Sequence, residues 1–458
     1  MIGEPNNDTV AAVATAPGEG AIAIVRMSGP DSLAIADRVF QGSVRPTRCP
    51  AGRFLYGTVR SPEGGAPALD EVLLLVFRAP HSYTREDTVE IQCHGGRVSA
   101  RRLLRAVLAA GARPAEPGEF TRRAFLNGRL DLLQAEAVAE LIRAQSERAA
   151  AVAFEQLQGR ASADIGAAHA ALLSIAADLE ASLDFDEDTV AEDVADDAGD
   201  RLRAAARSLA NLLHAAQEGR LLREGARVPI LGRPNAGKST LLNRLLGHDR
   251  AIVAATPGTT RDTIEETAIV EGFPIRLTDT AGLRETDCPV EQEGVGRARA
   301  LLDQADLVLY VLDARAPHRD DRQTLAELPA DRTVVVANKT DLGRALTLAD
   351  TAPHAPVFVS LLRDDGADAV RQALLARLQA LAGVELHALA SERHRDLLRQ
   401  ALDETEQAVR LAEAGRPDQH VLVARHAREA MALLGRITGG TGSDDVLDEV
   451  FRRFCVGK

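Results

Sequence analysis

The stretch Gly232-Arg-Pro-Asn-Ala-Gly-Lys-Ser239 decides the fold of the second half of this 458-residue chain. It follows the apolar run VPIL and precedes the amphipathic run TLLNRLLG, which is the strand-loop-helix setting that the pattern G-x-x-x-x-G-K-[ST] requires. Its glycines let backbone amides turn toward a phosphate at the positive end of the following helix. We expect Lys238 to reach the β- and γ-phosphates and Ser239 to bind Mg²⁺. The pattern predicts a nucleotide-binding loop that also includes Asn235, Ala236, Gly237 and Thr240.

Two later segments predict the rest of the nucleotide site. Asp279-Thr280-Ala281-Gly282 follows the apolar run PIRLT, so we expect Asp279 to hold Mg²⁺ through water and the Gly282 amide to approach the γ-phosphate. Asn338-Lys339-Thr340-Asp341 ends the run TVVVA. Asp341 can accept hydrogen bonds from guanine N1–H and the exocyclic amine, whereas adenine lacks that pair and would leave a buried carboxylate unsatisfied. GTP is therefore the predicted nucleotide, and ATP the poorer substrate.

The segments around the P-loop leave the catalytic residue open. Thr256-Pro-Gly-Thr-Thr-Arg-Asp262 lies where a first switch loop belongs and offers the Thr260 hydroxyl to Mg²⁺. Leu283 stands where Ras-like enzymes often place a glutamine that orients the attacking water. No arginine finger can be assigned, although Arg261 and Arg284 lie in these segments. Four carboxylates could replace the glutamine: Glu285, Asp287, Glu291 and Glu293.

Before residue 226 the chain has two regions that differ in the spacing of their apolar residues. Short extended runs at 21–29, 71–80 and 87–96, followed by a helical run from Arg97 to Ala110, predict a small N-terminal α+β domain. Apolar residues then recur at helical spacing to about residue 220, which predicts several packed helices. We expect the acidic run from Asp184 to Asp200 to be a solvated connection between helices rather than a metal site.

After residue 226 the pattern changes twice. Short apolar strands alternate with polar or helical segments, which predicts a doubly wound α/β domain. Helical periodicity returns after about residue 385 and continues to Lys458. We therefore expect the α/β domain to be inserted into one helical domain. Two independent helical domains flanking the α/β domain are the alternative.

Composition narrows the class of protein. Hydrophobic residues make up 45% of the chain and aromatic residues only 3%, which favours helices. The net charge is −13, and no run of Lys or Arg is long enough for a nucleic-acid arm, so action on RNA would need a partner with basic surface. Cys49, Cys93, Cys288 and Cys455 lie far apart, as in a reducing compartment. With no export signal or membrane span, the sequence predicts a soluble cytoplasmic protein.

Taken together, GRPNAGKS, TPGTTRD, DTAGLRE and NKTD, with the HGG and GEFTRRAFLN segments and the final FCVGK, resemble the MnmE (TrmE) family of tRNA modification GTPases. The similarity runs along the whole chain. It implies an N-terminal folate-binding and dimerising domain at 1–122 and a Ras-like G domain at 223–384. That G domain would be inserted into a helical domain made of residues 123–222 and 385–458.

The resemblance also implies further ligands in the nucleotide site. Asn235 and the loop residues Ala254, Thr256 and Thr259 would bind K⁺, and the ion would stand where other GTPases place an arginine finger. Glu291 would orient the attacking water, with Lys238 and Asn235 as the other catalytic residues. The remaining implied GTP contacts are Ala254, Ala255, Thr256, Pro257, Gly258, Thr259, Thr260, Asp279, Thr280, Ala281, Gly282, Asn338, Lys339, Asp341, Ser360 and Leu361.

For the N-terminal domain the resemblance implies a site for a tetrahydrofolate derivative, in a 5-formyl or methylene form. The implied ligands are Arg26, Glu90, Arg129 and Lys458. Folate carboxylates need cations, and the amine and N–H of the pterin need a carboxylate such as Glu90. Arg129 stands where the family often has lysine, which keeps the charge and alters the geometry.

Three smaller features do not have a role that the sequence alone assigns. The Cys455 thiol would lie beside the folate and either assist one-carbon chemistry or be a buried structural residue. His94 closes a strand before a glycine turn, as structural histidines often do. Ser360-Leu361-Leu362 departs from the family's Ser-Ala-Lys-like segment that backs guanine, and we expect the Leu361 amide to serve there instead.

The expected function follows from this resemblance. It is a potassium-dependent GTPase that, as a homodimer, adds an aminomethyl or carboxymethylaminomethyl group to carbon 5 of the wobble uridine of certain tRNAs. Tetrahydrofolate would donate the carbon, and an FAD-containing MnmG-like partner would join it in a heterotetramer or larger assembly. The alternative is a GTP-switched ribosome or RNA assembly factor without one-carbon chemistry, which would leave the folate-like residues unexplained.

Overall fold

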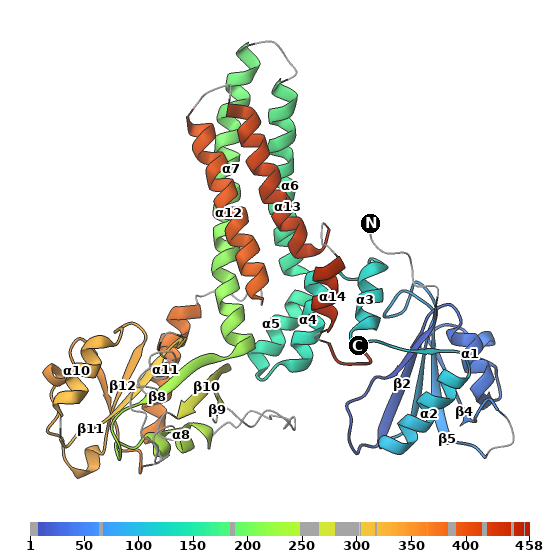
Figure 1. Cartoon of the computed structure of the whole chain (residues 1–458), viewed down its shortest axis with the longest axis horizontal. Coiled ribbons are helices and arrows are strands. Elements are labelled where there is room, and N and C mark those ends of the chain that lie inside the picture. Colours follow the sequence, from blue (N-terminus) through green and yellow to red (C-terminus); the bar gives the residue numbers. More distant parts are fainter. Residues whose placement is uncertain are drawn as a thin grey trace, which may run out of the picture. The chain divides into compact units, whose positions relative to one another are not determined.

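The computed structural model describes residues 8–63, 67–183, 188–247, 265–279, 302, 304–316, 318–363, 365–382, 391–414, 419–440, 444–452 and 454–458. The chain divides into two compact units (Figure 1). The first comprises residues 1–139 and 435–458, and the second comprises residues 140–434. Segments distant in the sequence therefore build the first unit.

A seven-stranded, mainly antiparallel sheet forms the base of the first unit, in the order β3-β4-β5-β6-β2-β1-β7. Its apolar residues alternate, so that Leu74, Val76 and Ile91 lie on one face and are fully buried. That face packs against the helices α1 (Ser32–Val39) and α2 (Arg97–Ala109), which confirms the predicted α+β arrangement. The strands are β1 (Val10–Val13), β2 (Ile22–Ser28), β3 (Phe40–Gly42), β4 (Arg53–Val59), β5 (Asp70–Phe77), β6 (Thr88–His94) and β7 (Arg113–Pro114).

Among the described residues of the first unit, the opposite face of this sheet is covered beside β1 and exposed over β4. Over β4 it displays Phe54 and Tyr56, which are 68% and 62% exposed. Beside β1, the helix α3 (Glu119–Leu126) buries Phe120 against Val10 and Ala12. The unit is completed by η1 (Pro46–Arg48), α14 (Asp444–Arg452) and most of α4 (Leu132–Arg143).

The bundle of the second unit consists of the long helices α6 (Arg160–Leu183), α7 (Asp188–Glu224) and α12 (Glu392–Glu413) and of most of α13 (His420–Thr438). The helix α7 packs along both α6 and α12 (Figure 1). Because α7 precedes the α/β part and α12 follows it, one bundle is interrupted by an insertion, and the predicted insertion is confirmed. None of the described helices is long and apolar enough to cross a membrane.

The acidic run is helical over most of its length, so the prediction of a connection over 184–200 is wrong from Asp188 onward, where α7 begins. Cations on helix faces offset part of the acidic charge. Arg201 of α7 pairs with Asp197 one turn earlier, at 3.1 Å, and with Asp178 of α6, at 2.7 Å. Among the described residues, no group of three or more His, Cys, Asp or Glu side chains could hold a metal ion.

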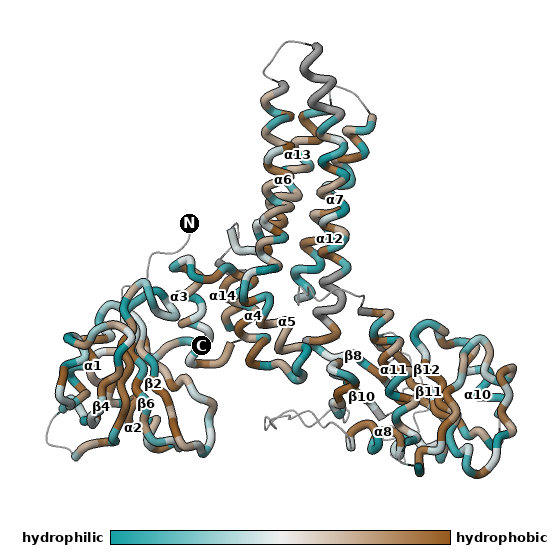
Figure 2. Tube along the Cα trace, turned by 180° about the vertical axis from the view of Figure 1, so that it is seen from behind, coloured by the Kyte–Doolittle hydropathy of each residue, from teal (hydrophilic) through white to brown (hydrophobic). Residues whose placement is uncertain are grey.

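A six-stranded sheet in the order β13-β12-β11-β8-β10-β9 forms the α/β part. Neighbouring strands are parallel except for β9, which pairs antiparallel with β10 at the edge. The strands β11 and β12 are nearly continuous hydrophobic runs, as in sheets covered on both faces (Figure 2). The elements are β8 (Ala226–Leu231), α8 (Lys238–Leu246), β9 (Glu265–Val270), β10 (Phe273–Asp279), β11 (Val308–Asp313), α10 (Arg319–Glu327), β12 (Thr333–Asn338), η3 (Thr340–Leu342), η4 (Leu348–Asp350), β13 (Pro356–Phe358) and α11 (Gly366–Ala382).

The helix α5 (Glu147–Leu157) joins the helical and α/β parts of the second unit. Its Ala149 and Val152 belong to the same buried cluster as the strands of the α/β sheet. The Arg148 guanidinium lies 4.4 Å from the ring centre of the buried Phe273, at the start of β10. The β9–β10 hairpin is therefore anchored to the bundle.

Candidate functional site

The P-loop joins β8 to α8 with a backbone that requires its glycines. Gly232 and Gly237 have φ angles of 137° and 111°, and a Cβ atom at Gly232 would lie 2.0 Å from the Val311 carbonyl oxygen. Asn235 also has a positive φ, 62°. The loop ends at the first turn of α8, whose amides and dipole favour an anion.

Lys238 is the first residue of α8 and is 8% exposed. Its Nζ donates hydrogen bonds to the carbonyl oxygens of Gly232 and Arg233, both at 3.0 Å. The ammonium therefore lies against the loop that is predicted to hold phosphate. Ser239 and Thr240 follow in the same helical turn and are exposed, so the Ser239 hydroxyl fits the predicted Mg²⁺ ligand.

Asn338 connects three segments of the nucleotide site. Its Nδ2 donates to the Ala236 carbonyl oxygen at 2.9 Å, and its Oδ1 accepts from the amides of Lys339 and Leu361 at 2.7 and 3.0 Å. A Cβ atom at Gly237 would lie 2.2 Å from Asn338 Nδ2. The phosphate loop and the predicted base-binding segments thus share one buried side chain.

Lys339 makes a second bridge to the P-loop. Its Nζ donates to the Asn235 carbonyl oxygen at 2.6 Å and to Asp313 Oδ2 at 2.9 Å. Hydrogen bonds from Arg315 and then Lys339 hold the pKa of Asp313 well below its usual range. Sequence reasoning missed Asp313. The feature that indicates its role is its position at the end of β11, where it is in register with Asn338 on the parallel strand β12.

The predicted base-binding residues lie around this bridge. Asp341 is exposed in η3, and the Thr340 amide donates to the Val359 carbonyl oxygen at 3.2 Å. Ser360 is 5% exposed, and its hydroxyl has no hydrogen-bond partner among the described residues. The Leu361 amide, expected to face the base, donates to Asn338 instead, and its side chain is 1% exposed. These contacts anchor the loop despite its departure from the family pattern.

Most predicted switch residues lie outside the described residues. They are Ala254, Ala255, Thr256, Pro257, Gly258, Thr259, Thr260, Thr280, Ala281, Gly282 and Glu291. Asp279 ends β10, where its backbone is in register with Ile230 of the parallel strand β8. Since β8 leads into the P-loop, the start of the DTAG segment lies at the same edge of the sheet as that loop.

The first unit contains a second cluster, built on the neighbouring strands β2 and β6. Arg26 and Glu90 are in register, and the Arg26 Nε and Nη2 atoms lie 2.8 and 2.7 Å from Glu90 Oε1. Their side chains are 15% and 17% exposed. The pair lies on the sheet face opposite α1 and α2.

Tyr83 connects this pair to Arg129, and sequence reasoning missed it. The guanidinium carbons of Arg26 and Arg129 lie 5.4 and 4.7 Å from the Tyr83 ring centre. Arg129 Nη1 also donates to the Tyr83 carbonyl oxygen at 2.8 Å, and Tyr83 Oη lies 2.9 Å from Thr121 Oγ1. Burial raises the pKa of Tyr83, so the phenol stays protonated. The sequence did contain one indication of this role. Tyr83 is one of only 3 tyrosines in the chain, and it lies between two predicted strands.

Lys458 joins the same cluster through the segment that carries it. The Phe120 amide donates to the Lys458 carbonyl oxygen at 3.2 Å. Gly457 has a φ of 98°, and a Cβ atom there would lie 2.3 Å from the Val13 carbonyl oxygen. Burial, followed by the charge of Arg26, lowers the pKa of the Lys458 ammonium, while Glu90 opposes the shift. All four residues predicted for folate thus lie in one cluster.

Two other candidates have simpler surroundings. Cys455 is an exposed thiol, and its carbonyl oxygen accepts a hydrogen bond from the Gly118 amide at 3.4 Å. His94 Nδ1 lies 2.6 Å from Asp70 Oδ1, which raises the pKa of His94, and the His94 side chain is 71% exposed. The histidine is therefore hydrogen-bonded to a carboxylate near the surface of the unit.

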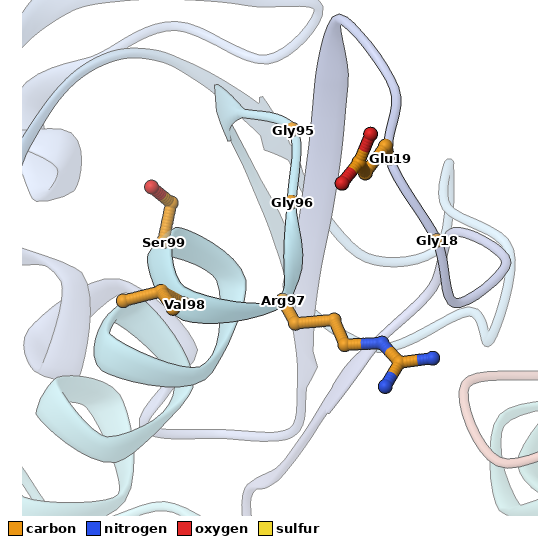
Figure 3. A pocket seen from close by; sticks show the side chains of 7 residues that line it. All are labelled: Gly18, Glu19, Gly95, Gly96, Arg97, Val98 and Ser99. Atoms are coloured by element: carbon orange, nitrogen blue, oxygen red, sulfur yellow. The ribbon is translucent and has the colours of Figure 1, made fainter.

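A cavity of about 590 Å³ opens at the start of α2 (Figure 3). It lies between the Gly18–Glu19 loop and the first turn of α2, and no residue predicted for GTP or folate lines it. The lining residues are Gly18, Glu19, Gly95, Gly96, Arg97, Val98 and Ser99.

A P-loop α/β domain inserted into a helical bundle, with an NKTD segment tied to the P-loop, defines a multidomain P-loop GTPase. Two family models match the sequence: "MnmE helical domain" over residues 132–455 and "GTP-binding protein TrmE N-terminus" over residues 9–129. The chain belongs to the MnmE (TrmE) family of tRNA modification GTPases, and it is a GTP hydrolase.

Individual relatives match nearly the whole chain. The tRNA modification GTPase MnmE of Geobacter sulfurreducens is 46% identical, over 98% of this chain and 99% of the relative. That of Symbiobacterium thermophilum is also 46% identical, with the same coverage. Among solved structures, the G domain of the T. maritima FeoB iron transporter is 25% identical, with a TM-score of 0.26, and covers 34% of this chain and 99% of its own.

Proposed function

We propose that this chain is a potassium-dependent GTPase that modifies carbon 5 of the wobble uridine of certain tRNAs. It would act with an FAD-containing MnmG-like partner, in a heterotetramer or larger assembly, and attach an aminomethyl or carboxymethylaminomethyl group. FAD would be bound by the partner. The observation that carries the proposal is the cluster of Arg26, Glu90 and Lys458 in a unit other than the one that holds the P-loop.

The residues of that cluster suit a tetrahydrofolate derivative. Lys458 and Arg129 can bind the carboxylates of the folate tail, and Glu90 can accept hydrogen bonds from the pterin amine and N–H. The bound folate would supply the one-carbon unit. In the nucleotide site, Ser239 and Thr260 would hold Mg²⁺, and Asn235, Ala254, Thr256 and Thr259 would hold K⁺. Glu291 would orient the attacking water, and Cys455 would lie beside the folate.

The open face of the first unit supports a homodimer. Phe54 and Tyr56 of β4 and Leu73 of β5 are exposed together on the face that carries Arg26 and Glu90. An exposed apolar sheet face of this kind is typical of a subunit interface. We place the domains at 1–122, 123–222 with 385–458, and 223–384, and the protein in the cytoplasm.

Mass spectrometry of tRNA nucleosides tests this function. A strain that lacks the gene should lose the modified wobble uridine, and a plasmid copy of the gene should restore it. If the nucleoside profile is unchanged, the proposal is wrong. Abnormal ribosome profiles with normal uridine modification would instead favour the GTP-switched assembly factor, which accounts for the P-loop but not for the folate-like cluster.

Folate binding should depend on Glu90. In the Glu90→Gln variant the Arg26 guanidinium loses its anionic partner and the pterin loses an ionic acceptor. A hydrogen bond to a charged group contributes about 1.5–3 kcal/mol, so we expect 5-formyltetrahydrofolate to bind roughly 10–100-fold more weakly in titration calorimetry. Glu63→Gln, at an exposed position of the same unit, should bind like the unsubstituted protein. Equal affinity in both variants would remove Glu90 from the folate site.

GTP hydrolysis should depend on potassium through Asn235. In KCl the rate is expected to exceed that in NaCl of equal ionic strength, because K⁺ would neutralise charge on the transferring phosphoryl group. Asn235→Ala should abolish the difference, with a loss of about 10²-fold in KCl, the usual cost of one stabilising contact in the transition state. Asn243→Ala, at an exposed position on α8, is the control. Equal rates in the two salts would refute the role of Asn235.

A further inference from the structure

The outward face of α2 carries a row of arginines that neither proposed site uses. Arg97, Arg101 and Arg105 follow one another at intervals of one helical turn, and Arg102 lies beside them. All four are exposed, while Ala100, Leu103, Ala106 and Val107 face the sheet. We call these four arginines the α2 arginine row.

The α2 arginine row has no acidic partners in the part of the chain that the structure describes. No carboxylate there forms an ion pair with any of the four guanidinium groups, and α2 itself contains no Asp or Glu. Some other arginines of this protein are paired with acidic side chains. Arg203, Arg399 and Arg410 each lie within 4.0 Å of a carboxylate. The row is therefore a local concentration of positive charge.

The surroundings extend this positive charge at the C-terminal end of α2. The Arg38 Nη1 atom donates to the Ala110 carbonyl oxygen, so another cation lies at the last turn of the helix. At the first turn, Arg97 extends beside the cavity of Figure 3, and Glu19 is the one acidic residue among the residues that line that cavity. Acidic and basic residues nearly balance in the first unit, so the net charge of −13 arises in the second.

The chemistry of the row favours a polyanion over an apolar partner. Val98, 71% exposed, is the one large apolar side chain exposed on α2. The core of a protein interface is depleted of charged residues, and an embedded membrane helix needs a large apolar face. Guanidinium groups bind phosphate oxygens in a two-pronged geometry, and a regular row of them matches a chain of phosphates. We infer that the α2 arginine row binds the phosphate backbone of an RNA, which in the proposed function is the tRNA substrate.

Salt dependence of tRNA binding tests the inference. The full-length protein and a variant with all four arginines of the row replaced by glutamine are titrated with a fluorescent transcript of a tRNA that has a wobble uridine. Each phosphate contact steepens the negative slope of log affinity against log salt by about 0.7–0.9. The slope of the variant should therefore be shallower by about 3. From 50 to 200 mM salt the unsubstituted protein should then lose about 60-fold more affinity than the variant.

A matched control removes the same number of charges elsewhere. Four arginines that each lie within 4.0 Å of a carboxylate are replaced by glutamine, and the slope should stay unchanged; they are Arg203, Arg332, Arg399 and Arg410. Replacing the row with lysines should keep most of the slope. An unchanged slope in the glutamine variant would overturn the inference and point to an acidic protein as the partner of the row. The nucleoside test would still decide the proposed function independently, since it does not involve α2.

Discussion

Replacing Asp341 with asparagine is expected to change the preferred base of this GTPase from guanine to xanthine. In the Asp341→Asn variant the amide Nδ2 faces the guanine amine, so two donors meet and neither finds an acceptor. Xanthine carries a carbonyl oxygen in place of that amine and restores the pair. A site built to hydrogen-bond a substrate group rejects an analogue that lacks it by about 10⁴-fold or more, so we expect the ratio of GTP to XTP affinity to change by roughly 10⁴-fold.

Separate titrations of each protein with fluorescent GTP and with fluorescent XTP measure this ratio. The surrounding frame should persist, because Asn338 and Lys339, rather than Asp341, make the bonds to the P-loop. Asp331→Asn, at a 77% exposed carboxylate of the same α/β part, should leave the preference for GTP unchanged. A variant that still prefers GTP would show that Asp341 does not read the base.

The sequence predicted the fold well where the period of its apolar residues was unambiguous. The runs at 71–80 and 87–96 correspond to β5 and β6, and NKTD begins at the last residue of β12. The strand β9 was missed because its residues, EETAIV, are half polar and it lies at a sheet edge. Edge strands are paired on one side only, so packing selects their side chains less strictly.

The acidic run shows why composition misled the helix prediction. Nine carboxylates over 184–200 suggested a solvated connection, yet α7 begins at Asp188. The sequence pattern contained no information about the neighbouring helix. Arg201 reaches across to Asp178 and Ser174 of α6, and such pairing between helices appears only after they pack.

Sequence motifs gave the residues of the nucleotide site but not the bonds that hold them together. The pattern GRPNAGKS fixed the glycines, whereas the roles of Asn338 and Asp313 depend on two parallel strands ending side by side. Likewise Arg26, Glu90 and Arg129 came from resemblance, and the Tyr83 ring that gathers the two arginines came from the tertiary fold. Contacts between residues distant in the sequence are set by topology, which no local pattern encodes.

Replacing Lys238 with arginine is expected to reduce kcat/KM for GTP by about 10²–10³-fold, although the charge is kept. The chain contains only three lysines, Lys238, Lys339 and Lys458, among its 54 cationic residues. All three lie in the proposed sites, whereas arginine serves everywhere else, including position 129. A compact ammonium fits where Lys238 is 8% exposed and bonded to two carbonyl oxygens at 3.0 Å, and a planar guanidinium does not.

Steady-state hydrolysis of GTP and thermal unfolding of the nucleotide-free protein together separate chemistry from folding. Lys238→Arg should lose activity while the unfolding temperature changes little, and Lys238→Ala should lose at least as much activity. Arg233→Lys, at an exposed position of the same loop, makes the reverse exchange and should retain nearly full activity. If Lys238→Arg keeps its activity within about threefold, positive charge alone suffices at this position. The concentration of lysine in the proposed sites would then have no basis in the geometry of the ammonium group.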